Sequence, residues 1–221
     1  MLKIVATPIG NLKDITIRAI ESLKECDFII AENPKNSLKL LNAYGVSRKP
    51  MVQFAEFNEK KILDTLVERL GRETGCLITD AGTPGVSDPG FRLARECTAK
   101  GLKIESVPGP SAAITALTVS GLPTDRFLFI GFLPRTENKL TEVLKLGMTT
   151  EATIIFFDSP FRIAKSVEII ARHFPEANLV VGRELTKLHE EIIRGKSGEV
   201  SKDLSGRKSI KGEIAGVISF K

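Results

Sequence analysis

The stretch GCLITDAGTPGVSDPGFRLARECTAKGLKIESV, residues 75–107, decides the fold class of this chain. The apolar run GCLIT predicts a strand, and DAGTPGVSDPG is a loop rich in Gly and Pro. Asp88 and Pro89 are a typical N-cap and first helical residue, and they predict a helix that runs to about Lys100. LKIESV predicts the next strand. The stretch therefore reads as a strand–helix–strand unit, the connection that joins parallel strands.

The same alternation fills the first half of the chain. Apolar runs predict further strands at 2–7, 27–31 and 51–55, and helical spacing or capping residues predict helices at 14–26, 37–43, 59–70 and 111–120. Strict alternation of this kind favours a parallel sheet with helices on both faces.

The pattern changes near residues 121–125, where a second domain is expected to begin. The predicted strands there are 126–131, 152–157, 178–182, 188–194, 198–201 and 213–220, with helices at 137–146 and 159–173. We therefore expect an α/β protein of two domains, an N-terminal parallel α/β domain over 1–121 and a C-terminal mixed α/β domain over 122–221.

Composition excludes several classes of protein. The chain has 221 residues, 42% hydrophobic and 27% charged, which is a globular balance, and its three cysteines are too few for a disulfide scaffold. No apolar run approaches the length of a membrane span, and the N-terminus has no signal-peptide pattern. We expect a soluble, cytoplasmic protein. Neither a P-loop nor the GxGxxG fingerprint of dinucleotide-binding proteins is present, and no metal-ligand spacing occurs.

Three loops are unusual in composition, and each follows the carboxyl end of a predicted strand. They are TPIGNL at 7–12, DAGTPGVSDPG at 80–90 and VPGPSAA at 107–113. Ligands of open parallel sheets bind at this edge, where Gly admits close backbone approach and Pro fixes the loop. Each loop alone could be a tight turn. Three at one edge favour a composite binding cleft.

Five motifs in order resemble the tetrapyrrole-methylase superfamily, and within it the family of ribosomal RNA small subunit methyltransferase I. The motifs are TPIGNLKDIT, TDAGTPGVSDPG, VPGPSAAITAL with the following SGLP and GFLPR, DSPFR, and RELTK. The resemblance spans residues 2–220. It implies two α/β domains with S-adenosylmethionine folded between them, a homodimer, and methylation of the ribose 2′-hydroxyl of a cytidine in small-subunit ribosomal RNA.

The resemblance also implies which residues bind the cofactor. By position in the motifs they are Ile9, Asp80, Gly82, Thr83, Ser111, Ala112, Phe157, Arg183 and Ala215, the last within 213–215. Asp80 could accept hydrogen bonds from the cofactor's amine or hydroxyls. The alternative is a turn-forming Asp before a Gly.

The chain departs from the family pattern on the substrate side. The family's Ala-Glu-Asp-Thr-Arg is Ala-Glu-Asn-Pro-Lys here at 31–35, and its Ser-Pro-His-Arg is Ser-Pro-Phe-Arg at 159–162. The remaining catalytic candidates are Glu32 as proton acceptor and Lys35 or Arg162 as the cation that stabilises a developing alkoxide. Glu32 could instead be paired with a lysine. Lys187 and Glu190 either line the cleft or form surface ion pairs.

Three functions stay open: an RNA ribose methyltransferase, a methyltransferase acting on a tetrapyrrole or a protein, and a cofactor-binding protein with little activity. The net charge of +5 is spread out, apart from a basic stretch at 194–211 that could meet RNA phosphates or form a solvated loop. The twelve Phe and one Tyr lie mostly at core-like positions, so no base-stacking platform is evident. We expect the small ribosomal subunit or its RNA as partner.

Overall fold

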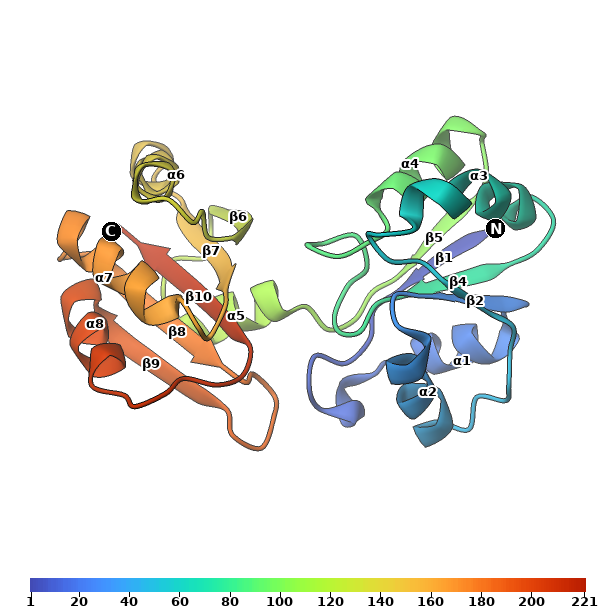
Figure 1. Ribbon diagram of the computed structural model, residues 1–221, viewed down its shortest axis with the longest axis horizontal. Coiled ribbons are helices and arrows are strands. Elements are labelled where there is room, and N and C mark those ends of the chain that lie inside the picture. Colours follow the sequence, from blue (N-terminus) through green and yellow to red (C-terminus); the bar gives the residue numbers. More distant parts are fainter. The chain divides into compact units, whose positions relative to one another are not determined.

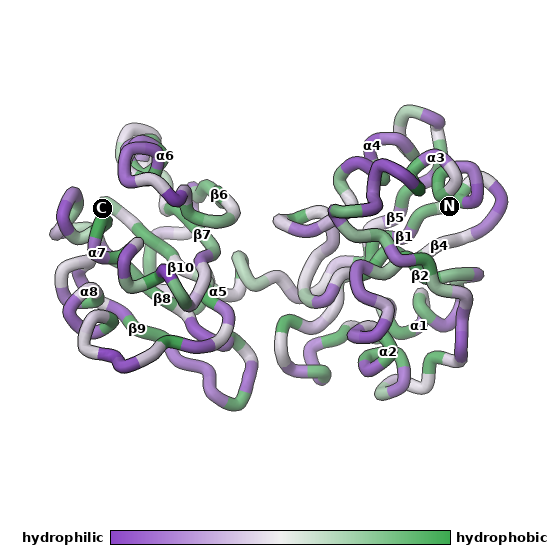
Figure 2. Tube along the Cα trace, in the orientation of Figure 1, coloured by the Kyte–Doolittle hydropathy of each residue, from purple (hydrophilic) through white to green (hydrophobic).

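A computed structural model describes all residues, 1–221, and the chain forms two compact units, 1–111 and 112–221 (Figure 1). The first unit is a parallel sheet with helices and the second a mixed sheet with helices, so the expected α/β class is confirmed. The strands of each unit follow the apolar segments of the chain, and the surface helices alternate between polar and apolar residues (Figure 2). None of the helices has the length and apolar character that crossing a membrane requires.

The first unit holds a five-stranded sheet in the order β3-β2-β4-β1-β5, and every pairing is parallel. The strands are β1 (Leu2–Val5), β2 (Phe28–Ala31), β3 (Met51–Gln53), β4 (Gly75–Ile78) and β5 (Ile104–Val107). Because β4, β1 and β5 are neighbours, the three unusual loops that follow them leave the same edge of the sheet.

Helices cover both faces of this sheet. They are α1 (Ile17–Glu25), α2 (Pro34–Ala43), α3 (Glu59–Leu70) and α4 (Phe91–Ala99), with a short 3-10 turn at Leu12–Asp14. The first two lie on one face and the last two on the other (Figure 1). Leu23 and Leu41 pack into one apolar cluster, and Leu70 and Leu93 pack into the second. The buried strands thus carry a core on each side, as continuous apolar runs require.

Three helix starts in this unit differ from the sequence prediction, and one of them is α2, which begins at Pro34 and not at Ser37. The cap of α1 is Thr16, whose Oγ1 accepts from the N–H of Ala19 at 3.1 Å, while Asp14 belongs to the preceding 3-10 turn. Helix α4 begins at Phe91, after Gly90 at a φ of +137°. Asp88 and Pro89 remain in the loop, where the Pro89 carbonyl accepts from Gly85 at 3.1 Å. The loop therefore extends further than its capping residues suggested.

The second unit is built on a five-stranded sheet in the order β6-β7-β10-β8-β9. β6 and β7 are parallel, and the other pairings are antiparallel. The strands are β6 (Phe127–Phe132), β7 (Thr153–Asp158), β8 (Asn178–Arg183), β9 (Glu191–Lys196) and β10 (Ile214–Ser219), and the helices are α5 (Ala112–Ser120), α6 (Glu137–Thr150), α7 (Ile163–His173) and α8 (Ser197–Ser205). Phe156, Ile170 and Leu204 lie in its buried core.

The unit boundary and one predicted strand differ from the sequence prediction. Helix α5 falls in the second unit, whereas the boundary was expected after it, because α5 packs on β10 and β7. The strand expected at 198–201 is wrong: these residues lie in α8. Glu199 accepts from the N–H of Lys196 at 2.8 Å and fixes the helix start, and Val200 and Leu204, one turn apart, are both buried.

Candidate functional site

The three loops of the first unit are joined by hydrogen bonds. The N–H of Thr7 donates to the Gly82 carbonyl at 2.8 Å, and the N–H of Gly82 returns a bond to the Thr7 carbonyl at 3.0 Å. The hydroxyl of Thr83 donates to the Pro110 carbonyl at 3.1 Å. The loop after β4 therefore bridges the loops after β1 and β5, and the three form one structure at the carboxyl edge of the sheet.

Gly82 and Ile9 meet at the centre of this structure. Gly82 has a φ of +77°, a conformation that favours glycine, and a Cβ there would lie 3.5 Å from Cγ2 of Ile9. Ile9 is only 5% exposed, so its side chain packs within the loops. The loops are thus held together by a buried contact between Gly82 and Ile9.

A polar cluster lies beside these loops, and it contains Asp80 and Glu32. The exposed carboxylate of Asp80 accepts from Nδ2 of Asn36 at 2.8 Å. The N–H of Asp80 donates to Oε2 of Glu32 at 3.3 Å. The sequence analysis missed Asn36, because only the sheet order reveals that α2, which follows β2, lies next to the loop after β4.

Glu32 has the properties of a proton acceptor. Burial raises the pKa of its carboxyl above the ordinary value, and the nearby charge of Asp80 raises it further, against the lowering effect of the Asp80 N–H. Glu32 forms no ion pair, so the alternative of a lysine-paired carboxylate finds no support. A carboxylate with a raised pKa is a better base near neutral pH than an ordinary one.

Lys35 lies in the first turn of α2, close in sequence to Glu32. Asn33 caps this helix by accepting from the N–H of Lys35 at 3.2 Å, and Pro34 occupies the first helical turn. The departure from the family pattern at these two positions thus gives a well-formed helix start. The side chain of Lys35 is exposed and forms no ion pair.

In the second unit, Phe157 and Ala215 are direct cross-strand partners. Phe157 on β7 pairs with Ala215 on β10, and Ala215 pairs in turn with Gly182 on β8. The ring of Phe157 contacts Phe129 and Phe132 edge to face, with ring centroids 5.0 and 5.9 Å apart. The structure therefore brings together two of the residues predicted to bind adenosine.

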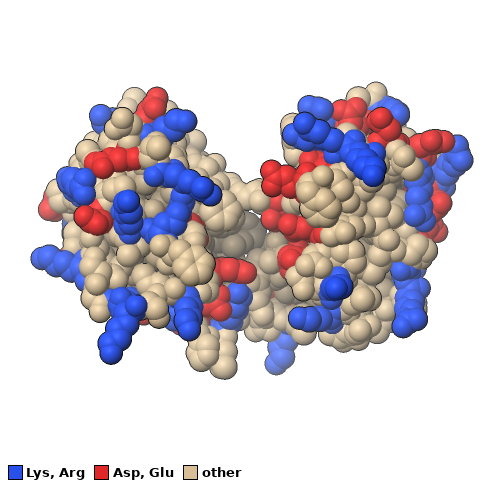
Figure 3. Space-filling view, in the orientation of Figure 1, with Lys and Arg blue, Asp and Glu red and all other residues tan.

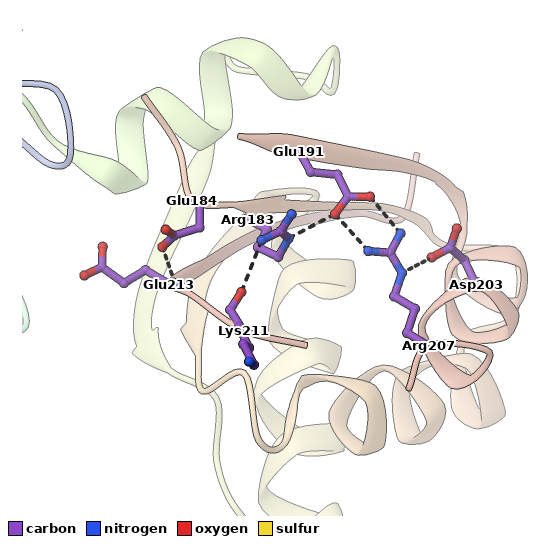
Figure 4. A network of polar contacts seen from close by, with 7 residues as sticks. All are labelled: Arg183, Glu184, Glu191, Asp203, Arg207, Lys211 and Glu213. Atoms are coloured by element: carbon purple, nitrogen blue, oxygen red, sulfur yellow. Dashed lines mark hydrogen bonds and ion pairs between the residues drawn. The ribbon is translucent and has the colours of Figure 1, made fainter. Parts of the chain in front are cut away.

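Arg183 pairs with Ile214, next to Ala215, but its side chain is engaged in an ion-pair network (Figure 4). Its Nε donates to Glu191 at 3.0 Å and its Nη1 to the Lys211 carbonyl at 3.3 Å. Glu191 also accepts two bonds from Arg207, each 2.8 Å long, and the Arg207 hydrogen bonds are the main reason that the pKa of Glu191 falls to about 2. The Arg183 guanidinium thus holds the strand ends together.

Arg162 is also held by the protein. Its Nε donates to the buried carboxylate of Asp158 at 2.5 Å, and its Nη2 donates to the Leu133 carbonyl at 2.6 Å. The helix expected to begin at Ser159 begins at Ile163 instead, and residues 159–162 form the turn that this ion pair fixes. Arg162 therefore positions the turn, and little of its charge is available to a substrate.

The basic stretch 194–211 is mostly regular structure, not a solvated loop. Arg194 donates to the Val119 carbonyl and Lys196 to the Glu176 carbonyl, while Arg207 is committed to Glu191. The free, exposed cations are Lys202, Lys208 and Lys211. On the face drawn in Figure 3, Lys and Arg side chains of the second unit lie near one another, with acidic side chains among them.

Four further candidates form local contacts or lie half-buried. Lys187 forms ion pairs with Glu184 at 2.8 Å and Glu213 at 3.2 Å, and Glu190 accepts from the N–H of Thr186, which fits the local, structural alternative for both. Ser111 and Ala112 lie in the third loop, and Ala112 is also the first residue of α5. Both residues are half-buried. No group of three or more acidic, His or Cys side chains is arranged to hold a metal ion.

Comparisons with known proteins agree with this architecture. A family model described as "Tetrapyrrole (Corrin/Porphyrin) Methylases" matches residues 1–201. A protein of Thermotoga maritima named ribosomal RNA small subunit methyltransferase I is 41% identical over 222 residues, covering 100% of this chain and 98% of that protein. A protein of the same name from Hydrogenobaculum is 41% identical, covering 99% of this chain and 95% of its own length. A crystal structure of diphthine synthase shares the fold, with a TM-score of 0.75 at 17% identity over 99% of this chain and 89% of that one.

Proposed function

Because the chain belongs to the tetrapyrrole methylase family, a family of methyltransferases, we propose that it transfers a methyl group from S-adenosylmethionine to the ribose 2′-hydroxyl of a cytidine in small-subunit ribosomal RNA. The observation that carries the proposal is the match, at about 41% identity over nearly the full length, to relatives named for ribosomal RNA methylation. Those names supply the acceptor class, and the cytidine and its 2′-oxygen come from the family resemblance of the motifs.

The loops of the first unit fit such a cofactor. S-adenosylmethionine offers an amine, a carboxylate and ribose hydroxyls, and it supplies an electrophilic methyl group on its sulfonium sulfur. Main-chain groups around Gly82 and Thr83 lie in loops fixed by mutual hydrogen bonds, and Asp80 presents an exposed carboxylate with room for further donors. We assign the methionine part and ribose to Asp80, Gly82 and Thr83, with Ser111 and Ala112 completing the loop contacts and Ile9 as the buried residue that packs against Gly82.

The adenosine part is assigned to the second unit, at Phe157 and Ala215. Phe157 and Ala215 are paired across neighbouring strands. Their main-chain groups, the aromatic ring of Phe157 and the small side chain of Ala215 therefore lie close together. Arg183 remains in the assignment as a positioning residue, because its guanidinium is bound to Glu191 and its strand ends beside Ala215.

Glu32 and Lys35 are the proposed catalytic residues. The carboxylate of Glu32 would accept the proton of the 2′-hydroxyl, and bound S-adenosylmethionine would supply the methyl group that this oxygen takes up. The ammonium group of Lys35 stabilises the negative charge that develops on the oxygen. Arg162, the other candidate cation, is assigned to the turn that it holds through Asp158.

The free cations Lys202, Lys208 and Lys211 are the proposed contacts to RNA phosphates, since neutralising a phosphate requires a positive charge that no carboxylate already occupies. We also propose a homodimer in the cytoplasm. Its support is the exposed apolar edge strand β6, where Phe127 is 42% exposed, because an unpaired edge with an apolar side chain invites association.

Radiolabelled methyl transfer tests the proposal. The purified chain, labelled S-adenosylmethionine and small ribosomal subunits from cells that lack this gene are expected to give stoichiometric label in the ribosomal RNA. Large subunits and total cell protein are the comparison acceptors. Label in a protein fraction, or binding of the cofactor without transfer to RNA, would favour the second candidate, a methyltransferase with another acceptor, which the departures at Asn33, Pro34 and Phe161 motivate.

A further inference from the structure

Phe161 is the most exposed large apolar side chain of the protein, with 96% of its surface accessible. It lies in the turn between β7 and α7, in the second unit. The ring therefore lies open to solvent on an ordered turn, where covering it by a ligand would remove apolar surface from water.

The turn that carries Phe161 is rigid. The N–H of Phe161 donates to Oγ of Ser159 at 3.3 Å, and the N–H groups of Arg162 and Ile163 donate to the Ser159 carbonyl at 3.0 Å. Pro160 restricts the backbone further. The side chain of Arg162 then ties the turn to Asp158 and to the loop after β6. The ring is therefore presented at a fixed place and loses little entropy when a ligand covers it.

Two exposed cations lie a few residues from the segments that meet at this turn. Arg135 is exposed two residues after Leu133, whose carbonyl accepts from Arg162, and Lys165 is exposed in the first turn of α7. Neither forms an ion pair. The acidic residues of the two segments are already occupied, since Asp158 pairs with Arg162 and Glu137 pairs with Arg172. The turn thus combines one open aromatic face with free cations.

We propose that Phe161 stacks on an unpaired base of single-stranded RNA, with Arg135 and Lys165 contacting the flanking phosphates. This inference rests on the proposed function, which makes RNA the substrate. An aromatic face beside cationic side chains is the combination that binds single-stranded nucleic acid. Phe132, which precedes Leu133, is also 60% exposed, but the sequence neighbours of the ring, Ser159, Pro160 and Arg162, are small or polar, and a second protein would need a broader apolar surface. In this proposal the ring of Phe161 is the stacking platform that the sequence did not reveal.

The absence of tryptophan from the chain allows a direct test. Phe161→Trp introduces one indole whose emission is quenched when a base stacks on it. Met148→Trp is the matched control, because Met148 is exposed in the same unit near the end of α6, away from the turn. Both variants are titrated with a single-stranded RNA oligonucleotide of about 12 nucleotides and with an abasic oligonucleotide of the same length.

We expect saturable quenching of Phe161→Trp by the RNA, much weaker quenching by the abasic strand, and none in Met148→Trp. Equal quenching by both strands, or none by either, would overturn the stacking role. In methylation of small ribosomal subunits, Phe161→Ala is expected to raise the half-saturating subunit concentration about tenfold, and Phe161→Tyr to restore it, with unchanged cofactor affinity.

The outcomes separate this inference from the proposed function. If the wild-type chain methylates subunits and Phe161→Ala does so equally well, the stacking inference is contradicted and the proposed function is not. A wild-type chain that transfers no methyl group contradicts the proposed function, and the oligonucleotide titration still decides whether the ring stacks. A change of oligomeric state in Phe161→Ala by light scattering, with RNA affinity intact, would assign the ring to a second copy of the chain and overturn the proposal.

Discussion

Replacing Glu32 with Gln removes the proposed proton acceptor and little else. The Glu32 carboxylate accepts one N–H, from Asp80 at 3.3 Å, and has no ion pair. The amide oxygen of Gln can accept the same bond, so we expect the free energy of unfolding to change by less than about 1 kcal/mol. Loss of a general base costs a factor of about 10²–10⁴ in rate, or roughly 3–5 kcal/mol of barrier. Activity and stability should therefore separate clearly.

The pH dependence adds a second readout for Glu32. Its pKa is raised by burial, so the carboxylate that accepts the proton forms only at a pH above the ordinary carboxyl range of about 4.3. The wild-type rate of single-turnover methyl transfer should rise with pH through that raised pKa and then level off. The acid limb should be absent from the residual rate of Glu32→Gln.

The assay is single-turnover transfer of labelled methyl to small ribosomal subunits with saturating cofactor, and calorimetry measures cofactor affinity in parallel. Glu21→Gln is the matched control, because Glu21 is an exposed carboxylate on α1 with no ion pair. A Glu32→Gln variant with wild-type rate and an unchanged acid limb would refute the assignment of Glu32 as the base. A tenfold or greater loss of cofactor affinity would move Glu32 to the cofactor site instead.

Three further predictions concern Asp80, Glu191 and the exposed lysines of the second unit. Asp80→Ala should weaken S-adenosylmethionine by about 1–3 kcal/mol in calorimetry if the exposed carboxylate makes a charged hydrogen bond to it, and unchanged affinity would count against that contact. The folded-state pKa of Glu191, about 2, lies below its unfolded value of about 4.3, so the stability that its ion pairs give should be present above that pH and lost as pH falls toward 2; urea unfolding of Glu191→Gln should show a smaller loss across this window. The third change replaces Lys202, Lys208 and Lys211 with Ala. The salt dependence of RNA binding should then lose about one unit of slope for each phosphate contact removed, with cofactor affinity unchanged. An unaltered slope would place the RNA elsewhere.

The parallel sheet was predictable because its signals are local and repeated. Helix α3 has the bounds that helical spacing indicated, Glu59–Leu70, since Leu66, Val67 and Leu70 are buried on one face. The carboxyl-edge loops were recognised from composition, and their contact follows from β4, β1 and β5 being neighbours. Strand order itself is a long-range property, so Asn36 beside Asp80 could not be read from the chain.

Errors arose where a tertiary or capping contact overrides a short pattern. The segment 198–201 looked like a strand, but Val200 and Leu204 are buried one helical turn apart and the Glu199 cap starts a helix. Ser159 and Pro160 looked like a helix start, but the Asp158–Arg162 ion pair extends the turn to Arg162. Charge patterns also mislead, because a sequence does not reveal which cations are already paired, as Arg207 is with Glu191.

The measurement that tests the central claim most directly is nucleoside-resolved mass spectrometry of small-subunit ribosomal RNA after incubation of unmodified subunits with the purified chain and S-adenosylmethionine. The account predicts one new modified nucleoside, a cytidine whose added methyl group stays with the ribose when the base is released. Its yield should fall with Glu32→Gln and remain with Glu21→Gln. A methyl group on a base or on a ribosomal protein, or unmodified RNA from a chain that binds the cofactor, would contradict it.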